Sequence, residues 1–460
     1  MSINQSPLEL WGGVECTINR VRNTFHDQCA WSGHRDQVEA DLELFADLGL
    51  QTLRTAFPWE HFAHSEDWRF ADRTIGAMER MRMRPIVGLL HHGSGPHDTS
   101  LLDPAFAPRL AAFALQVAQR FPWVSDYTPV NEPQTTSRFS CLYRHWYPHH
   151  GSPRSYVRAL LNQVKGVALA MEAIRSVQPE ARLIHTEDAG RTFSTPPLES
   201  FRIEREHRRW LGLDLLCGCV LRDHPLFHFL LHHGADEREL LWFAEHPCPP
   251  SVIGLNYYVT SDRFLDHRVE LYPSSFRGGD TGSEPLVDIE AVRIMPEGIA
   301  GAKSVLLEAW HRYKLPLAIT EAHLGSTPHE QVRWLTEIWQ GAEDALACGA
   351  DVRAVTAWGL LGLHNWSNLC TQDADAYEAG VFDVSSGTRR STELATLVQQ
   401  LATGQPPQHP ALSSPGWWRT DSRLTLPAND REAQDPHRSL THSHGGNHPA
   451  YQPERSLVQA

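Results

Sequence analysis

The strongest constraint on the fold is a regular alternation of short apolar runs with segments whose apolar residues recur at helical spacing. Eight runs predict strands, at residues 8–14, 52–57, 84–90, 127–132, 181–186, 251–257, 315–321 and 352–358. Nearly all of these strands are followed by a predicted helix, and continuous apolar runs are typical of parallel strands buried on both faces. Eight such units favour an α/β fold of the (β/α)8 TIM barrel type over an open sheet, at roughly 400 residues with insertions.

The composition changes near residue 403. Residues 1–403 carry the predicted barrel, whereas 404–460 are rich in Pro, Ser, His and Gly and have few apolar side chains beyond Trp417 and Trp418. Such a segment cannot bury enough apolar surface to offset its ordering entropy. We therefore expect 404–460 to be a low-complexity tail that is largely disordered.

Charge and hydropathy exclude several classes of protein. The chain has 460 residues and a formal net charge of −14, which argues against nucleic acid as a partner. Its first residues lack the basic and apolar regions of a secretory signal, and no apolar run reaches the roughly 20 residues of a membrane span. The eight cysteines form no C-x-x-C pair. These features favour reduced thiols in a cytoplasmic protein that does not bind membranes.

Two glutamates end predicted strands: Glu132 ends the fourth and Glu321 the seventh. In a closed barrel these strands lie opposite each other, and active sites lie at the carboxyl ends of the strands. Two carboxylates across a pocket are what glycosidic cleavage needs, one to protonate the leaving oxygen and one to attack or to activate water. Arg54, Asn256 and Tyr258 also lie at strand ends, where they would keep one glutamate ionised. The alternative is that each glutamate only caps a strand through a salt bridge.

The chain resembles glycoside hydrolase family 1, the retaining β-glycosidases, over about residues 9–402. The resemblance is carried by the order and spacing of seven motifs, which are LWG from residue 10, LRTAFPW from 53, VGLLH from 87, NEP from 131, IGLNYY from 253, ITE from 319 and AWGLL from 357. It implies a β-glucosidase-like hydrolase of O-glycosyl compounds in carbohydrate metabolism. It also implies no metal and no organic cofactor, and a small-molecule or oligosaccharide β-glycoside as the partner.

The resemblance also implies a role for each matching residue. Glu132 would be the general acid/base and Glu321 the nucleophile, with Arg54, Asn256 and Tyr258 supporting the nucleophile. The substrate-binding residues would be Asn19, His91, Asn131, Tyr258, Trp358, Asn365 and Trp366. Among these, Asn131 would bind the 2-hydroxyl of the sugar and Trp358 would stack on its ring face.

Three positions depart from the family pattern. Asn19 stands where the family has Gln, His92 follows His91 where the family has Trp, and Asn365 replaces the Glu that clamps the 4- and 6-hydroxyls. We therefore expect weak discrimination at those two sugar positions. No Lys follows Lys314, which argues against the 6-phospho branch. The W-G-G-x-E-C start is similar to that of a bacterial subgroup sometimes fused to a dTDP-4-dehydrorhamnose reductase-like domain.

Other interpretations remain open. A sugar-binding pseudo-enzyme or regulatory partner in a sugar-nucleotide pathway would not need both carboxylates, and a transglycosidase would have the same residues as a hydrolase. His224, His228 and His232 are spaced for one helix face, which allows a metal site, but no carboxylate lies between them as in H-E-x-x-H. A partly exposed polar helix face is the preferred interpretation.

Overall fold

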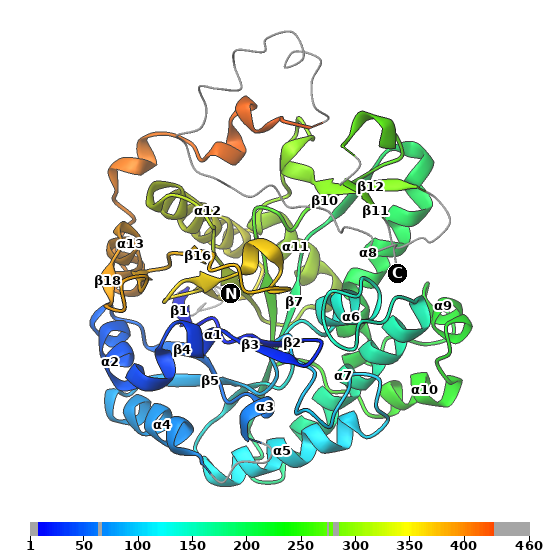
Figure 1. Cartoon of the computed structure of the whole chain (residues 1–460), viewed down its shortest axis with the longest axis horizontal. Coiled ribbons are helices and arrows are strands. Elements are labelled where there is room, and N and C mark those ends of the chain that lie inside the picture. The colour runs from blue at the N-terminus through cyan, green and yellow to red at the C-terminus, as the bar shows by residue number, and fades with distance from the viewer. Residues whose placement is uncertain (1–7, 63–66, 274–275, 279–284, 427–460) are drawn as a thin grey trace.

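Eight parallel strands close into a barrel, as predicted. The computed structural model describes residues 8–62, 67–273, 276–278 and 285–426. Around the barrel the strands follow the chain, with β1 paired to β14 to close it (Figure 1). In chain order they are β1 (Glu9–Gly13), β4 (Thr52–Ala56), β5 (Arg84–Gly88), β6 (Asp126–Thr128), β7 (Arg182–Asp188), β9 (Val252–Asn256), β13 (Leu317–Ala322) and β14 (Val352–Ala357).

Helices surround the barrel (Figure 1). The longer ones are α2 (His34–Asp47), α4 (Arg69–Met81), α5 (Phe106–Arg120), α7 (Pro153–Arg175), α8 (Glu199–Leu216), α11 (Ala302–Tyr313), α12 (Pro328–Ala347) and α13 (Glu393–Ala402). The shorter ones are α1 (Gln28–Trp31), α3 (Trp59–Phe62), α6 (Pro133–Cys141), α9 (Phe227–His232) and α10 (Glu237–Glu245). Their apolar faces form two large buried clusters with the strands. Nowhere in the described chain is there a helix with the length and apolarity needed to cross a lipid bilayer.

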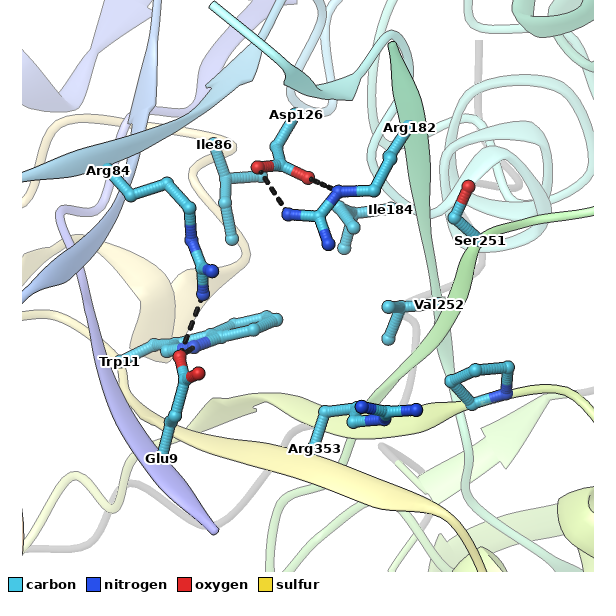
Figure 2. Close-up of a pocket in the computed structure, with 11 residues that line it drawn as sticks. Glu9, Trp11, Arg84, Ile86, Asp126, Arg182, Ile184, Ser251, Val252 and Arg353 are labelled. Atoms are coloured by element: carbon cyan, nitrogen blue, oxygen red, sulfur yellow. Dashed lines mark hydrogen bonds and ion pairs between the residues drawn. The ribbon is translucent and has the colours of Figure 1, made fainter. Parts of the chain in front are cut away.

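The interior of the barrel is filled near the amino ends of the strands. One apolar layer there consists of Trp11, Ile86, Ile184, Val252, Ala318 and Ala354. Below it lies a cavity of about 260 Å³ (Figure 2). Its charged side chains are paired, Arg84 with Glu9 and Arg182 with Asp126, each at 2.7 Å, and Arg353 with Asp351 at 2.6 Å. This end of the barrel therefore has the features of a stabilising floor, in keeping with the usual role of that face.

Several small sheets lie at the opposite end of the barrel, where the carboxyl ends of its strands lie. The hairpin β2 (Ile18–Val21) and β3 (Thr24–Asp27) follows β1, and β15 (Leu363–His364) pairs with β16 (Tyr377–Glu378) after β14. A four-stranded sheet contains β8 (Thr192–Ser194), β10 (Arg263–Asp266), β11 (Arg277–Gly278) and β12 (Leu286–Glu290). A last pair joins β17 (Phe382–Asp383) to β18 (Arg390–Ser391). The sequence did not reveal these strands, because two to five residues carry little periodic signal.

The segment after residue 403 differs from the expected disordered tail. Residues 404–426 pack on the barrel, next to α12 in Figure 1. Trp418 is fully buried against Trp334 of α12, and its indole nitrogen donates to Glu337 at 2.8 Å. The low apolar content predicted disorder, but one buried indole with a satisfied N–H is enough to dock a short segment on an existing core. Residues 427–460 lie outside the described chain.

Candidate active site

Glu132 lies just beyond the fourth barrel strand. Asn131 continues β6 through isolated bridges to His91 and Thr186, and Glu132 is the N-cap of α6. The backbone of Glu132 has φ 45°, a left-handed conformation that is unfavourable for a residue with a Cβ. His92 and Asn365 share this conformation, with φ 55° and 57°. Strained residues of this kind concentrate at functional sites, where the surrounding structure enforces them.

Glu321 lies on the seventh strand, β13, and is 2 % exposed. The Arg54 guanidinium of β4 donates to one carboxylate oxygen at 3.0 Å. The Tyr258 hydroxyl, beyond the end of β9, donates to the other oxygen at 2.6 Å. Both contacts favour the ionised carboxylate, and both residues were predicted for this role.

The side chain of Asn131 is held by Arg54, Thr186 and His91. Its side-chain oxygen accepts from Arg54 at 3.0 Å and from Thr186 at 2.6 Å. Its amide nitrogen lies 3.1 Å from Nε2 of His91. Within the described chain, one amide N–H of Asn131 has no acceptor, which is compatible with the predicted contact to a sugar hydroxyl.

Asn256 corrects one prediction. It was expected to support Glu321, but its amide donates to Glu132 at 2.6 Å. The Asn256 oxygen is held by the Thr320 hydroxyl at 2.7 Å, which directs the amide N–H toward the end of β6. Glu132 thus has a neutral partner where Glu321 has a cation. The strand-end position predicted that Asn256 lies in the site but not which glutamate it contacts.

The two glutamates also differ in acidity. Burial, then the repulsion from Glu321 and Asp188, raises the pKa of Glu132 to about 8. Burial raises the pKa of Glu321 to about 7, although Arg54 and Tyr258 act to lower it. The order suits the general acid/base role that the resemblance implies for Glu132. We expected Arg54 to dominate at Glu321, but the cost of burial outweighs it.

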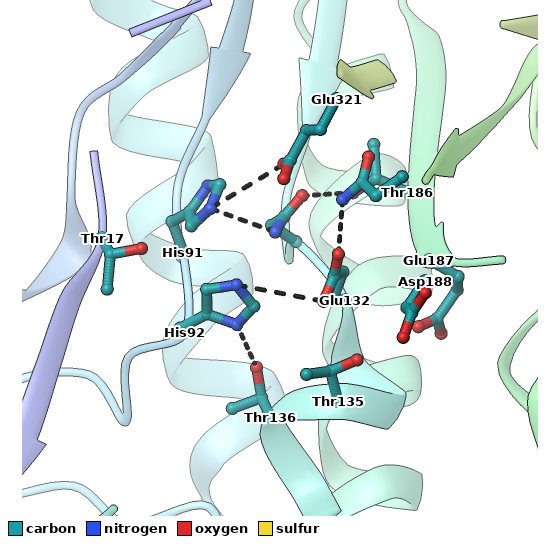
Figure 3. Close-up of polar contacts among 12 residues, drawn as sticks. Thr17, His91, His92, Glu132, Thr135, Thr136, Thr186, Glu187, Asp188 and Glu321 are labelled. Carbon is teal, nitrogen blue, oxygen red and sulfur yellow. Dashed lines mark hydrogen bonds and ion pairs between the residues drawn. The ribbon is translucent and has the colours of Figure 1, made fainter. Parts of the chain in front are cut away.

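Two adjacent histidines cover one side of the site. His91 stacks on Trp358 with ring centres 5.4 Å apart, and Nε2 of His92 lies 4.0 Å from Glu132 (Figure 3). Burial lowers the pKa of His91 well below its usual value and that of His92 to about 3. Both rings are therefore neutral near pH 7 and act as hydrogen-bonding groups. The guanidinium of Arg54 also lies over the Trp358 ring, 4.6 Å from its centre.

Asn365 does not face the two glutamates as a substrate clamp. Its amide donates to Asp373 at 3.0 Å, and its oxygen accepts from the backbone of Ala374 and Ala376 at 2.9 and 3.2 Å. Three of its four hydrogen-bonding positions therefore serve the loop after β14. The contacts of this side chain are those of a loop-stabilising residue, a role that differs from the predicted one because sequence spacing cannot show which way a side chain turns in an αL position.

Asn19 and Trp366 flank the same loop. The amide of Asn19 donates to the Cys370 carbonyl at 2.9 Å, so this residue fixes the loop to β2. Trp366 packs edge-on against His92 and Trp146, with ring centres 5.5 and 6.3 Å away.

The three histidines that were predicted to share a helix face do not all lie on one helix. Helix α9 begins at Phe227, and His224, which precedes it, lies 3.3 Å from Asp214. The described residues contain no cluster of three or more potential metal ligands.

Glu15 is the residue that sequence reasoning missed. It follows β1, is 4 % exposed and accepts from the indole nitrogen of Trp358 at 3.2 Å. Burial raises the pKa of its carboxyl group. A glutamate at a barrel strand end was the signal that identified Glu132 and Glu321, and it was present here too. It was overlooked because the resemblance directed attention to Asn19.

Comparisons with known proteins show the fold. No family model and no curated protein matches the chain. Among solved structures, Thermotoga maritima β-glucosidase in complex with deoxynojirimycin matches with a TM-score of 0.69 and 15 % identity, covering 88 % of this chain and 100 % of that one. A complex with a methoxycarbonyl-substituted glucoimidazole gives 0.70 and 15 %, with the same coverage. A structure described as the family 1 β-glucosidase of that organism gives 0.68 and 14 %, again covering 88 % and 100 %. The chain shares the fold of these proteins.

Proposed function

We propose that this chain is a retaining β-glycoside hydrolase of glycoside hydrolase family 1 that cleaves O-glycosidic bonds by double displacement. The observation that carries the proposal is the contrast between two buried glutamates at the same end of the barrel. Glu321 accepts hydrogen bonds from a guanidinium and a phenol, whereas Glu132 accepts one from a neutral amide. Surroundings that differ in this way favour an ionised nucleophile at one glutamate and a protonated general acid at the other.

Each step follows from these surroundings. Glu321 attacks the anomeric carbon while Glu132 gives its proton to the leaving oxygen, which produces a covalent glycosyl-enzyme. Glu132 is then ionised and takes a proton from water, which attacks the same carbon and releases Glu321. Two inversions restore the β configuration. Asn131, whose side chain is held by Arg54, Thr186 and His91, would use its remaining amide N–H to bind the neighbouring sugar hydroxyl.

The proposal is tested with aryl β-glycosides. We expect hydrolysis of at least one member of a panel containing the glucoside, galactoside, fucoside, mannoside and xyloside. The first-formed sugar, observed by NMR before it mutarotates, should be the β-anomer. If the α-anomer forms first, the reaction proceeds by a single displacement with inversion, and the double-displacement mechanism is wrong. Products longer than the substrate would show that acceptors other than water react, as in a transglycosidase.

A sugar-binding protein without activity is the second candidate, but no specific observation favours it. Binding alone does not require a carboxylate with a raised pKa opposite one that is held by a cation. Binding of the same glycosides without cleavage would nevertheless establish it.

A further inference from the structure

A second buried glutamate lies beside Glu132. Glu187 belongs to β7, is 2 % exposed, and lies on the side of Glu132 away from His92 in Figure 3. Its Oε2 atom accepts from the backbone N–H of Gln134 at 3.3 Å, in the first turn of α6. The N–H groups of a first turn have no partner within the helix, and the side chain of the N-cap residue usually supplies one. The Glu132 side chain makes no such bond, so Glu187 takes its place.

The helix on the other side of Glu187 leaves room for its carboxyl group. The Oε1 atom faces Gly212 of α8, where a Cβ would lie only 2.4 Å from it. Glycine weakens a helix interior, so the space that Glu187 needs explains why α8 has a glycine here. Among the described residues Oε1 has no hydrogen-bond partner, and it lies 3.6 Å from Nε2 of His185. The carboxyl group is thus enclosed by β7, α6 and α8.

No cation at ion-pair distance offsets a charge on Glu187. In the part of the chain that the structure describes, no arginine or lysine pairs with it, and Arg138 pairs instead with Asp188 at 3.8 Å. The ring of His185 is neutral near pH 7, because burial lowers its pKa to about 3. The titratable and charged groups that face Glu187 are Glu132 and Arg138 at α6, Asp188 and His185 of β7, and Tyr156 of α7.

Burial decides whether Glu187 is charged. Burial, and after it the repulsion from Glu132, raises the pKa of this carboxyl group well above its usual value. The partial positive charge at the N-terminus of α6 and the charge of Arg138 favour the ionised form. Both effects are weaker than the cost of burying a carboxylate that has no paired cation. Glu187 is therefore an uncharged carboxylic acid near pH 7.

We propose that Glu187 is a positioning residue for the general acid/base: as an uncharged carboxylic acid it holds the first turn of α6, and with it the backbone of Glu132, without adding a negative charge beside that glutamate. This inference rests on the proposed function. Glu132 has a backbone φ of 45°, a strained conformation that the surrounding structure has to enforce. An ionised Glu187 would oppose the loss of the proton that Glu132 has to give to the leaving oxygen.

The first test compares two leaving groups on the aryl β-glycoside that the substrate panel identifies. A phenyl glycoside needs protonation of its leaving oxygen, whereas a 2,4-dinitrophenyl glycoside needs little. Glu187→Ala should lower kcat/KM roughly 10- to 100-fold for the phenyl glycoside, because Glu132 is no longer held in place, and less than about threefold for the dinitrophenyl glycoside. Glu187→Gln keeps an uncharged acceptor and should recover most of that loss. Equal losses on both substrates would overturn the inference while leaving the hydrolase intact.

Glu206→Ala is the matched control. Glu206 lies on α8, and its carboxylate also accepts from a backbone N–H, that of Thr192, at 2.6 Å. Because this contact does not hold α6, its loss should change kcat/KM of both substrates by the same factor. If Glu187→Ala does not fold, Glu187→Asp, whose side chain is one CH2 shorter, should show the same dependence on the leaving group.

The pH profile tests the charge of Glu187. An uncharged group exerts no repulsion on Glu132, so Glu187→Gln should leave the basic limit of kcat/KM near pH 8 in place. A basic limit that moves downward by more than about half a pH unit would show that Glu187 is ionised in the unmodified protein. That result would overturn the inference.

Two further measurements separate this inference from the proposed function. Near pH 7, the infrared difference spectrum between the unmodified protein and Glu187→Gln should contain the C=O band of a protonated carboxyl group. The backbone amide of Gln134 should exchange its hydrogen faster in Glu187→Ala, and at an unchanged rate in Glu206→Ala. If no glycoside is cleaved, the hydrolase proposal fails, and these results still decide whether an uncharged Glu187 holds α6. Absence of the band, or equal exchange in all three proteins, would overturn the inference.

Discussion

At the scale of single residues, the roles proposed for Glu132 and Glu321 rest on the different neighbours of the two carboxyl groups. Without the Glu321 carboxylate no covalent intermediate forms, so Glu321→Gly should lose hydrolysis by several orders of magnitude. Azide should restore cleavage by attack from the vacated face, giving the α-glycosyl azide. In Glu132→Ala the intermediate still forms from activated aryl glycosides, and azide should give the β-glycosyl azide. NMR of the two products checks the assignment, and the reverse pairing would exchange the two roles.

The pH dependence of activity is a second prediction about these residues. The active form has Glu321 ionised and Glu132 protonated, so kcat/KM should fall below a pH near 7 and above a pH near 8. These limits belong to the pair and not to either residue alone. Tyr258→Phe removes a hydrogen bond that favours ionised Glu321, so the acidic limit should move upward. An acidic limit that stays in place or moves downward would contradict the role of Tyr258.

Sequence reasoning placed the right residue types at this site and failed where orientation mattered. Seven of the predicted residues come together at the carboxyl ends of the strands, because the sequence itself shows which residues end a strand. They are Glu132, Glu321, Arg54, Asn131, His91, Tyr258 and Trp358. Asn256 contacts the other glutamate and Asn365 turns into its loop. Those outcomes depend on χ angles and loop conformation, which spacing does not encode.

At the scale of elements, the loop after β14 depends on Asn365. Asn365→Ala would leave the backbone N–H groups of Ala374 and Ala376 without their acceptor and place Ala at φ 57°. We expect a loss of roughly 1–3 kcal/mol in the free energy of unfolding. Asn368→Ala is the control, because the Asn368 side-chain oxygen has no hydrogen-bond partner in the described chain. Urea denaturation measures both variants, and equal stabilities would show that the Asn365 contacts contribute nothing.

Segment 404–426 packs on the barrel although its amino-acid composition predicted disorder. Trp418 is fully buried and hydrogen-bonded to Glu337, so Trp418→Ala should lower the free energy of unfolding by about 3–5 kcal/mol. Trp123, which is 39 % exposed, provides the control Trp123→Ala with little expected change. A chain that ends at Leu426 should melt like the full chain, and one that ends at Thr403 should melt at lower temperature. Equal melting of both would mean that the segment does not stabilise the barrel.

At the scale of the whole molecule, the barrel was predictable because the same sequence pattern occurs in each of its eight βα units. All eight predicted strands are present, in chain order around the barrel, since each βα unit carries its own apolar run and amphipathic helix. The additions at the carboxyl ends were not predictable. Elements such as β15 and β16, two residues each, form only because the finished barrel supports them.

The buried glutamates also make the stability of the whole molecule depend on pH. Burial raises the pKa of Glu132 to about 8, whereas the unfolded chain releases that proton near pH 4.5. Between pH 4.5 and 8 the folded state therefore binds more protons than the unfolded chain. The free energy of unfolding falls over this range, and the stability contributed by protonated Glu132 is lost as pH rises through 8. As pH rises past 6.5, the buried histidines, whose folded-state pKa values are lowered, lose their proton in the unfolded state too, so their opposing contribution fades. Glu132→Gln, which carries no such proton, should gain about 2 kcal/mol over the unmodified protein between pH 6.5 and 8, from 1.36 kcal/mol per pH unit. Urea denaturation at several pH values measures the difference, with Glu343→Gln on the exposed face of α12 as control. Parallel curves for the Glu132 variant and the unmodified protein would show that Glu132 is already ionised in the folded state at pH 6.5, and a general acid with a raised pKa would then have to be sought elsewhere in the site.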